Sequence, residues 1–117
     1  MDLDPGQMLP LSAQVFHILI ALADGERHGY AIMQDVLTRT SGRIKLSPGT
    51  LYGAIKRLLE DGLIEEREEQ PAGAGHDERR RYYRLTIFGR RVAEAEAERM
   101  AALLRQARSS GLLPKTT

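Results

Sequence analysis

The chain contains no cysteine and no tryptophan among its 117 residues. The missing thiols exclude disulfides, thiolate metal sites and cysteine nucleophiles, and they fit a reducing compartment. Long apolar runs are missing too, because the most apolar stretch, residues 15–23, is interrupted by His17 and falls short of the roughly 20 residues that span a bilayer. Asp2 and Asp4 stand where a signal peptide would be basic. We expect a soluble cytoplasmic protein with no membrane contact.

The sequence also lacks the patterns of metal binding and catalysis. His17, His28 and His76 do not show the His-Glu-x-x-His spacing of a zinc site. Gly73 and Gly75 resemble a phosphate-binding loop only superficially, since no Lys-Ser/Thr pair follows them. We therefore expect no metal, no cofactor and no enzymatic activity.

Charge is balanced overall but unevenly distributed. The net charge is only +1, yet six basic residues stand against the single acid Asp35 between positions 27 and 57. These basic residues are Arg27, Arg39, Arg43, Lys45, Lys56 and Arg57, and a second cluster contains Arg79, Arg80, Arg81 and Arg84. Such local clusters favour an anionic partner on one face more than the total charge indicates.

Two amphipathic helices are predicted at the start of the chain. Ser12 is a good N-cap for a helix whose apolar residues recur at three- and four-residue steps until Asp24-Gly25 ends it. A second helix is expected from about Gly29 to Arg39.

The third helix has the clearest start, because Ser47 can cap it and Pro48 fits its first position. Gly62 follows its end. The side opposite the apolar stripe presents Gly49, Thr50, Gly53, Lys56, Arg57 and Glu60. A helix with a slim tip, hydrogen-bonding groups at Ser47, Thr50 and Tyr52, and a cationic flank suits the DNA major groove.

Gly53 lies in the middle of this helix, where glycine costs about 1 kcal/mol relative to alanine. Close approach to DNA would compensate for that cost. The alternative is that Gly53 makes room for a neighbouring helix.

A β-hairpin is predicted next. Its strands are Leu63–Glu69 and Arg81–Thr86, and a glycine-rich loop containing residues 71–75 joins them. Arg79, Arg80 and Arg81 enter the second strand, where a basic ribbon can follow the DNA backbone or enter the minor groove. The alternative is a solvated charge cluster.

The last helix is expected from a cap at Thr86 to about Ser109. A narrow heptad seam along it favours pairing with a second copy, whereas packing within one subunit is the alternative. With two residues of the first helix, the expected dimer interface is Val15, Leu19, Ala93, Ala97, Met100, Leu103, Leu104 and Ala107.

These elements define the expected organisation. The fold class is mainly α with a small β-hairpin, arranged as a winged helix-turn-helix over residues 11–86 followed by a dimerisation helix over 87–110. Residues 1–10 are expected to form a flexible arm, and residues 111–117 a flexible tail.

Several segments resemble the PadR-like bacterial transcriptional regulators. They are His28-Gly-Tyr-Ala-Ile32, Leu46-Ser-Pro-Gly-Thr-Leu-Tyr-Gly-Ala-Ile-Lys-Arg-Leu58, Asp61-Gly-Leu-Ile64 and Arg81-Tyr-Tyr-Arg-Leu-Thr86 with Gly89. The resemblance covers about residues 11–100 and implies DNA binding by a homodimer at an inverted-repeat operator. By analogy, Ser47, Thr50, Tyr52 and Lys56 fall on the recognition helix, Tyr30 lies near the backbone, and Arg79–Arg81 form the wing.

The resemblance also implies repression that a small-molecule effector relieves, at or near the dimer interface. Phe16, His17 and Met100 could line such a pocket, although Phe16 and Met100 also suit an ordinary core. The competing function is a winged-helix module that binds proteins instead of specific DNA. The acidic residues Glu65, Glu66, Glu68 and Glu69 beside the wing fit such a protein contact.

Overall fold

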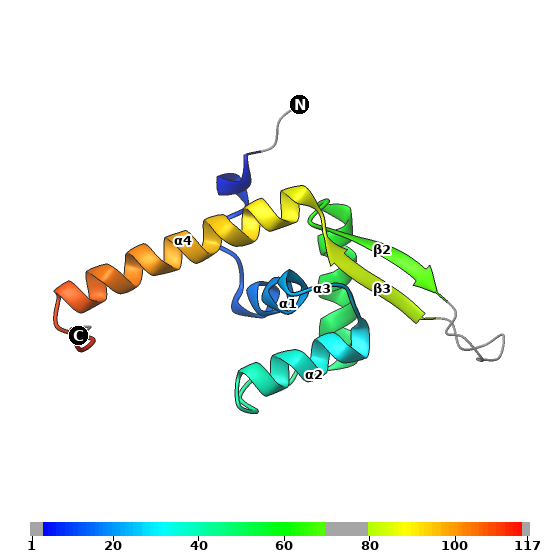
Figure 1. The fold of residues 1–117 in the computed structure, drawn as a ribbon, viewed down its shortest axis with the longest axis horizontal. Coiled ribbons are helices and arrows are strands. Elements are labelled where there is room, and N and C mark those ends of the chain that lie inside the picture. Colours follow the sequence, from blue (N-terminus) through cyan, green and yellow to red (C-terminus); the bar gives the residue numbers. More distant parts are fainter. Residues whose placement is uncertain (1–3, 70–79, 116–117) are drawn as a thin grey trace.

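Four α-helices and a small antiparallel sheet make up residues 4–69 and 80–115, which are the residues that the computed structural model describes. The elements run in this order: η1 (Pro5–Met8), α1 (Ala13–Ala23), β1 (Arg27–His28), α2 (Gly29–Arg39), α3 (Pro48–Glu60), β2 (Ile64–Glu69), β3 (Arg80–Leu85) and α4 (Ile87–Ser109). This architecture confirms the expected mainly helical winged-helix fold (Figure 1).

The helices begin where the sequence places their caps. The Ser12, Ser47 and Thr86 hydroxyls accept hydrogen bonds from the backbone N–H groups three residues later, at 3.2, 3.1 and 2.9 Å. Each bond satisfies one of the N–H groups that a helix start leaves without a partner. Gly62, just after α3, has φ of 75°, a conformation that favours glycine.

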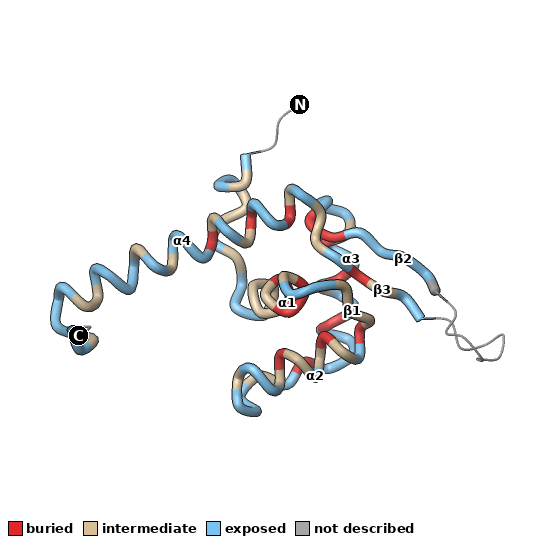
Figure 2. The backbone as a smooth tube through the Cα atoms, viewed as in Figure 1, coloured by how far each residue is buried: buried red, intermediate tan, exposed pale blue. Residues whose placement is uncertain are grey.

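Helix α1 is central to the packing, because helices α2 and α4 and strand β3 all contact it. The buried residues of the helices and the sheet form a common apolar core, and Figure 2 shows their positions along the backbone. Its members are Ile18, Leu19, Ala21, Leu22, Ile32, Val36, Leu46, Leu51, Ile55, Leu58, Leu63, Ile64, Tyr83 and Val92. Gly89 lets α4 approach β2 closely, since a Cβ there would lie 1.8 Å from the Leu63 carbonyl oxygen.

The sheet has three strands in the order β1-β3-β2, one more than the predicted hairpin. Strand β1 pairs Arg27 with Tyr83 and His28 with Tyr82, immediately before α2 begins. A strand of two polar residues shows no alternation that sequence periodicity could detect. The extra strand fixes the start of α2 to the wing.

Within the segment expected to form a flexible arm, Pro5–Met8 forms the short helix η1. This short helix packs on α4, and Met8 and Leu9 lie against the core. The Leu11 N–H donates to Glu96 Oε2 at 2.8 Å, and Arg99 donates to the other carboxylate oxygen. Glu96 is fully buried by these contacts. The apolar residues of the segment cover α4, so the segment is ordered.

The second half of α4 extends away from the rest of the molecule (Figure 1). The radius of gyration is 16.5 Å, against about 13 Å for a compact chain of this size. Beyond Glu96 no described residue of α4 is buried, and Leu103 and Leu104 are 56% and 51% exposed (Figure 2). Residues 111–115 of the expected flexible tail turn back, as the Leu112 N–H donates to the Ala107 carbonyl oxygen at 2.9 Å.

Candidate nucleic-acid interface

The polar face of α3 is exposed as the sequence indicates. Leu51, Ile55 and Leu58 are buried. The opposite face is exposed and contains Gly49, Thr50, Tyr52, Gly53, Lys56, Arg57 and Glu60. The burial pattern therefore presents the residues predicted to meet DNA to the solvent.

The Ser47 and Thr50 hydroxyls are linked at the start of α3. Ser47 Oγ accepts from the Thr50 N–H and donates to Thr50 Oγ1 at 2.9 Å. Ser47 is thus engaged in capping, while the Thr50 hydroxyl keeps its own proton for an outside acceptor. Of these two side chains, Thr50 is the better placed to contact a base.

Gly53 has open space around it. A Cβ built there would meet no atom of the described chain within 4 Å, and the same holds for Gly49. The alternative explanation, that Gly53 makes room for a neighbouring helix, is not supported because no such helix lies beside it among the described residues. The result favours close approach of another molecule to α3.

Ion pairing divides the basic residues into two groups. Arg27 and Arg39 both pair with Asp35, Arg39 also pairs with Asp24, and Arg67 pairs with Glu26. On the wing, Arg84 pairs with Glu65 at 2.6 Å. Within the described ranges, no acidic partner neutralises Arg43, Lys45, Lys56, Arg57, Arg80 or Arg81. Within the two basic clusters, the unpaired cations thus belong to the loop before α3, to α3 and to β3. Helix α4 also has arginines without an acidic partner in the described ranges, among them Arg91 and Arg105.

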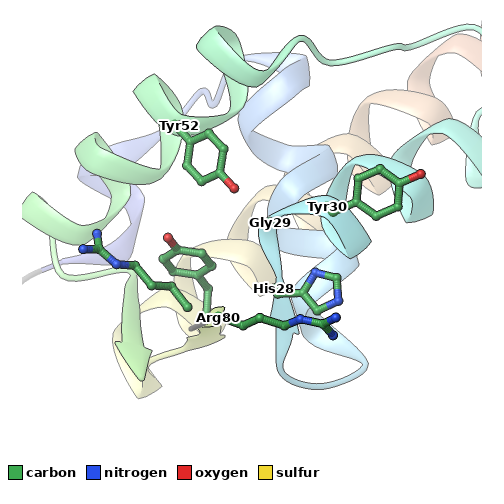
Figure 3. Close-up of a pocket in the computed structure, with 7 residues that line it drawn as sticks. His28, Gly29, Tyr30, Tyr52 and Arg80 are labelled. Carbon is green, nitrogen blue, oxygen red and sulfur yellow. The ribbon is translucent and has the colours of Figure 1, made fainter. Parts of the chain in front are cut away.

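A hollow of about 530 Å³ lies between the start of α2, the face of α3 and strand β3 (Figure 3). Its lining consists of His28, Gly29, Tyr30, Tyr52, Arg80, Arg81 and Tyr83. The Tyr52 side chain lies over Gly29, because a Cβ on this glycine would be 2.4 Å from the Tyr52 hydroxyl oxygen. Tyr30 is 62% exposed, and its ring points away from Tyr52 (Figure 3).

His28 joins the hollow to the sheet. Its Nδ1 accepts the Ala31 N–H at 3.2 Å and caps α2, and its ring contacts Tyr82 edge-on. Burial lowers the pKa of His28, and the nearby charge of Arg80 lowers it further. Burial also raises the pKa of Tyr83, with the carboxylate of Glu66 adding to the effect. No sequence motif assigned His28, Gly29 or Tyr83 to a site, although the glycine before Tyr30 was an available signal.

Some of the residues predicted for the dimer interface and the ligand pocket do not lie at those sites, and Arg79, predicted for the DNA interface, lies outside the described residues. Leu19 is fully buried in the core. It has no exposed surface for a partner, so we remove it from the expected dimer interface. Phe16 lines a groove of about 230 Å³ between α1 and α4 together with Ala93 and Ala97. His17 lines a different hollow, so the expected ligand pocket is not a single cavity.

In the described ranges, no three side chains of the metal-binding types come together. No described helix combines the length and apolar character that crossing a membrane requires.

Comparison with known proteins identifies relatives. A 37.1 kDa protein of transposon TN4556 from Streptomyces fradiae is 43% identical over 86 residues, which are 74% of this chain and 22% of that protein. Transcriptional regulator Rv3488 of Mycobacterium tuberculosis is 37% identical over 90 residues, 77% of this chain and 78% of Rv3488. The chain therefore spans about a fifth of the first relative and most of the second.

Solved structures share the fold. Bacillus subtilis PadR in complex with operator DNA matches with a TM-score of 0.64 and 23% identity, over 74% of this chain and 46% of that one. The model of the transcriptional regulator PadR-like family matches residues 18–95, about two thirds of the chain. The chain belongs to the PadR-like family of transcriptional regulators.

Proposed function

We propose that the chain regulates transcription, as a homodimer that binds operator DNA in the cytoplasm. Its family consists of transcriptional regulators and not of enzymes. The observation that carries the proposal is the unpaired positive charge of α3 and β3 beside the two exposed glycines of α3. Slim, cationic surfaces of this kind suit the DNA backbone and grooves.

In the proposed complex, α3 lies in the major groove. Thr50 contacts base edges, Gly49 and Gly53 allow the helix to approach them, and Lys56 and Arg57 contact phosphates at the flank. The wing arginines Arg79 to Arg81 follow the backbone beside the groove. Bacillus subtilis PadR, which shares this fold, was solved with operator DNA.

The proposed dimer forms through α4. Leu103 and Leu104 are exposed on the projecting half of the helix, and a lone helix with such a seam has little of its own chain to cover it. Ala93, Ala97, Met100 and Ala107 continue the seam, and Val15 of α1 lies half-buried beside the core. Two-fold symmetry then implies an inverted-repeat operator with half-sites about 34 Å apart.

The proposed mode of control is repression that a small molecule relieves. The groove lined by Phe16, Ala93 and Ala97 is mainly apolar and shares two residues with the proposed seam. A ligand in this groove would change how two copies of α4 pack and hence the spacing of the two recognition helices. Met100 and His17 do not line this groove, so Phe16 is the proposed contact.

Selection of bound duplexes from a random pool tests the proposal. We expect an inverted repeat to emerge, and its affinity to fall steeply with salt because several phosphates are contacted. Weak binding with no sequence preference at any ionic strength would favour the protein-binding alternative. In that case the glutamates of β2 become the surface to examine.

A further inference from the structure

The hollow between α2, α3 and β3 is lined by a tyrosine that the proposed function does not use. Tyr83 is only 3% exposed, yet it lines the hollow. No described residue hydrogen-bonds its hydroxyl, and no described side-chain oxygen is both buried and without a partner, so the hydroxyl oxygen itself is open to the hollow. A hydroxyl that is open to the hollow can donate a hydrogen bond to a group from outside the chain.

The charge around this hydroxyl identifies the partner's chemistry. Arg80 and Arg81 line the same hollow, and neither has an acidic partner among the described residues. Figure 3 shows Arg80 beside His28, which caps α2. No carboxylate belongs to the lining, although Glu66, Glu68 and Glu69 stand opposite Tyr83, Arg81 and Arg80 in the strand register. The hollow is therefore cationic and rich in hydrogen-bond donors.

The start of α2 supplies further donors at the edge of the hollow. Gly29 and Tyr30 occupy the first two positions of the helix, where N–H groups lack partners within the helix. The positive end of the helix dipole adds to the charge of the arginines. The Tyr52 hydroxyl faces the same point, over Gly29. Several donors converging with two guanidinium groups match the acceptor oxygens of a phosphate.

We propose that this hollow seats one phosphate group, held by the Tyr83 and Tyr52 hydroxyls, by Arg80 and Arg81, and by the start of α2. The inference rests on the proposed function in one respect, because the expected source of the phosphate is the DNA backbone between α3 and the wing. Free phosphate presents the same oxygens and is the other source. Tyr52 then contacts the backbone and positions α2, in place of the base contact expected from the sequence.

Binding of inorganic phosphate to the full-length protein tests the site without DNA. Backbone amide NMR signals are followed while sodium phosphate replaces sodium chloride at constant ionic strength and pH. We expect saturable shifts at Gly29, Tyr30 and Arg81, at least tenfold weaker binding in Tyr83→Phe, and unchanged binding in Tyr82→Phe. Tyr82 is the matched control, because its ring contacts His28 edge-on, lies against the Arg67 guanidinium, and does not line the hollow.

DNA binding assigns the source. In fluorescence anisotropy with the selected duplex, Tyr83→Phe should weaken binding about tenfold with the salt slope unchanged, since a neutral donor is lost. Arg81→Ala should weaken it and reduce the slope by about one phosphate, while Arg105→Ala on α4 should do neither. Wild-type binding by both hollow variants, together with saturable phosphate shifts, would assign the site to free phosphate. If neither phosphate nor these variants had any effect while the wild type still selected an operator, the phosphate site would be refuted and the proposed function would stand.

Discussion

Gly53 and Gly89 are both helical glycines, but they serve opposite purposes. Gly89 is required by packing within the chain, because any Cβ there would overlap the Leu63 carbonyl. Gly53 faces open space, so nothing in the chain itself requires a glycine. Comparing alanine at the two positions separates a need of the fold from a need of the partner.

Gly53→Ala is expected to stabilise the protein and weaken its DNA binding. Alanine gains about 0.5–1 kcal/mol of helix propensity in a site with free space. The added methyl group would hold α3 away from the base edges and lower the affinity about tenfold. Urea unfolding and anisotropy titration on the same preparation measure the two effects. Equal affinity would show that DNA does not approach α3 at this position.

Gly89→Ala is the matched comparison, and it should destabilise the fold by about 1–3 kcal/mol, as overpacking does. Its expected DNA affinity, measured on the folded fraction, is that of the wild type.

Charge counting along the sequence could not distinguish paired cations from unpaired ones. Arg27, Arg39 and Arg84 belong to the basic clusters, yet each holds a carboxylate in an ion pair. Their partners come from different elements or from a neighbouring turn, so the sequence alone could not sort paired cations from free ones. The hollow escaped prediction for a related reason. In the sequence, Tyr82 and Tyr83 are adjacent tyrosines of one predicted strand. Only the packing of β3 shows that Tyr83 is the buried one.

At the scale of elements, helix starts that have a capping side chain could be predicted from the sequence. Elements without a cap or a periodic pattern could not. The starts of α1, α3 and α4 follow from side-chain caps that the structure confirms. Strand β1 is two residues long, and η1 depends on packing against α4, so neither has a periodic pattern. Glu96 reads as a solvent-facing residue of a charged helix, but η1 covers it and makes it the anchor of the N-terminal segment.

Lys56 represents the cationic flank of α3. Lys56→Ala should weaken operator binding and reduce the salt slope by about one, because one phosphate contact is lost. Lys115→Ala, an exposed lysine beyond α4, is the control with no expected effect. Anisotropy titrations at several salt concentrations measure both quantities. An unchanged slope in Lys56→Ala would remove this lysine from the interface.

Glu96 should make the attachment of η1 sensitive to acid. The hydrogen bond from Arg99 holds the pKa of Glu96 below its usual range despite burial, and the Leu11 N–H contributes in the same direction. A carboxyl group with a lowered folded-state pKa stabilises the fold above its unfolded value, near pH 4.3. That stability disappears as the pH falls through the lowered folded value.

Glu96→Gln removes this titration. The melting temperature of the wild type should exceed that of the variant at pH 7, and the gap should narrow below about pH 4. Glu94→Gln, at an exposed position of α4, serves as the control with no gap at either pH. A gap that stays constant down to pH 3 would mean that the charge of Glu96 does not hold the segment.

At the scale of the whole molecule, the shape itself argues for a partner. Helix α4 has 23 residues, about 35 Å at the helical rise, and the chain covers only its first half. Exposed leucines on the remaining half would be costly in a monomer, and a second α4 offers the complementary seam. The distance between the two recognition helices of a dimer is then set by how the two copies of α4 cross.

Leu104→Asp tests this arrangement. An unpaired carboxylate in the seam should cost about 3–5 kcal/mol, more than 100-fold in dimer affinity. Light scattering should then report the monomer mass of 13.1 kDa at concentrations where the wild type is dimeric. Leu112→Asp, an exposed leucine beyond the helix, should remain dimeric. The Leu104→Asp monomer should keep its circular dichroism spectrum and bind an isolated half-site as the wild type does, but lose the advantage of the full inverted repeat. A Leu104→Asp protein that stays dimeric would place the interface on a different face of the molecule.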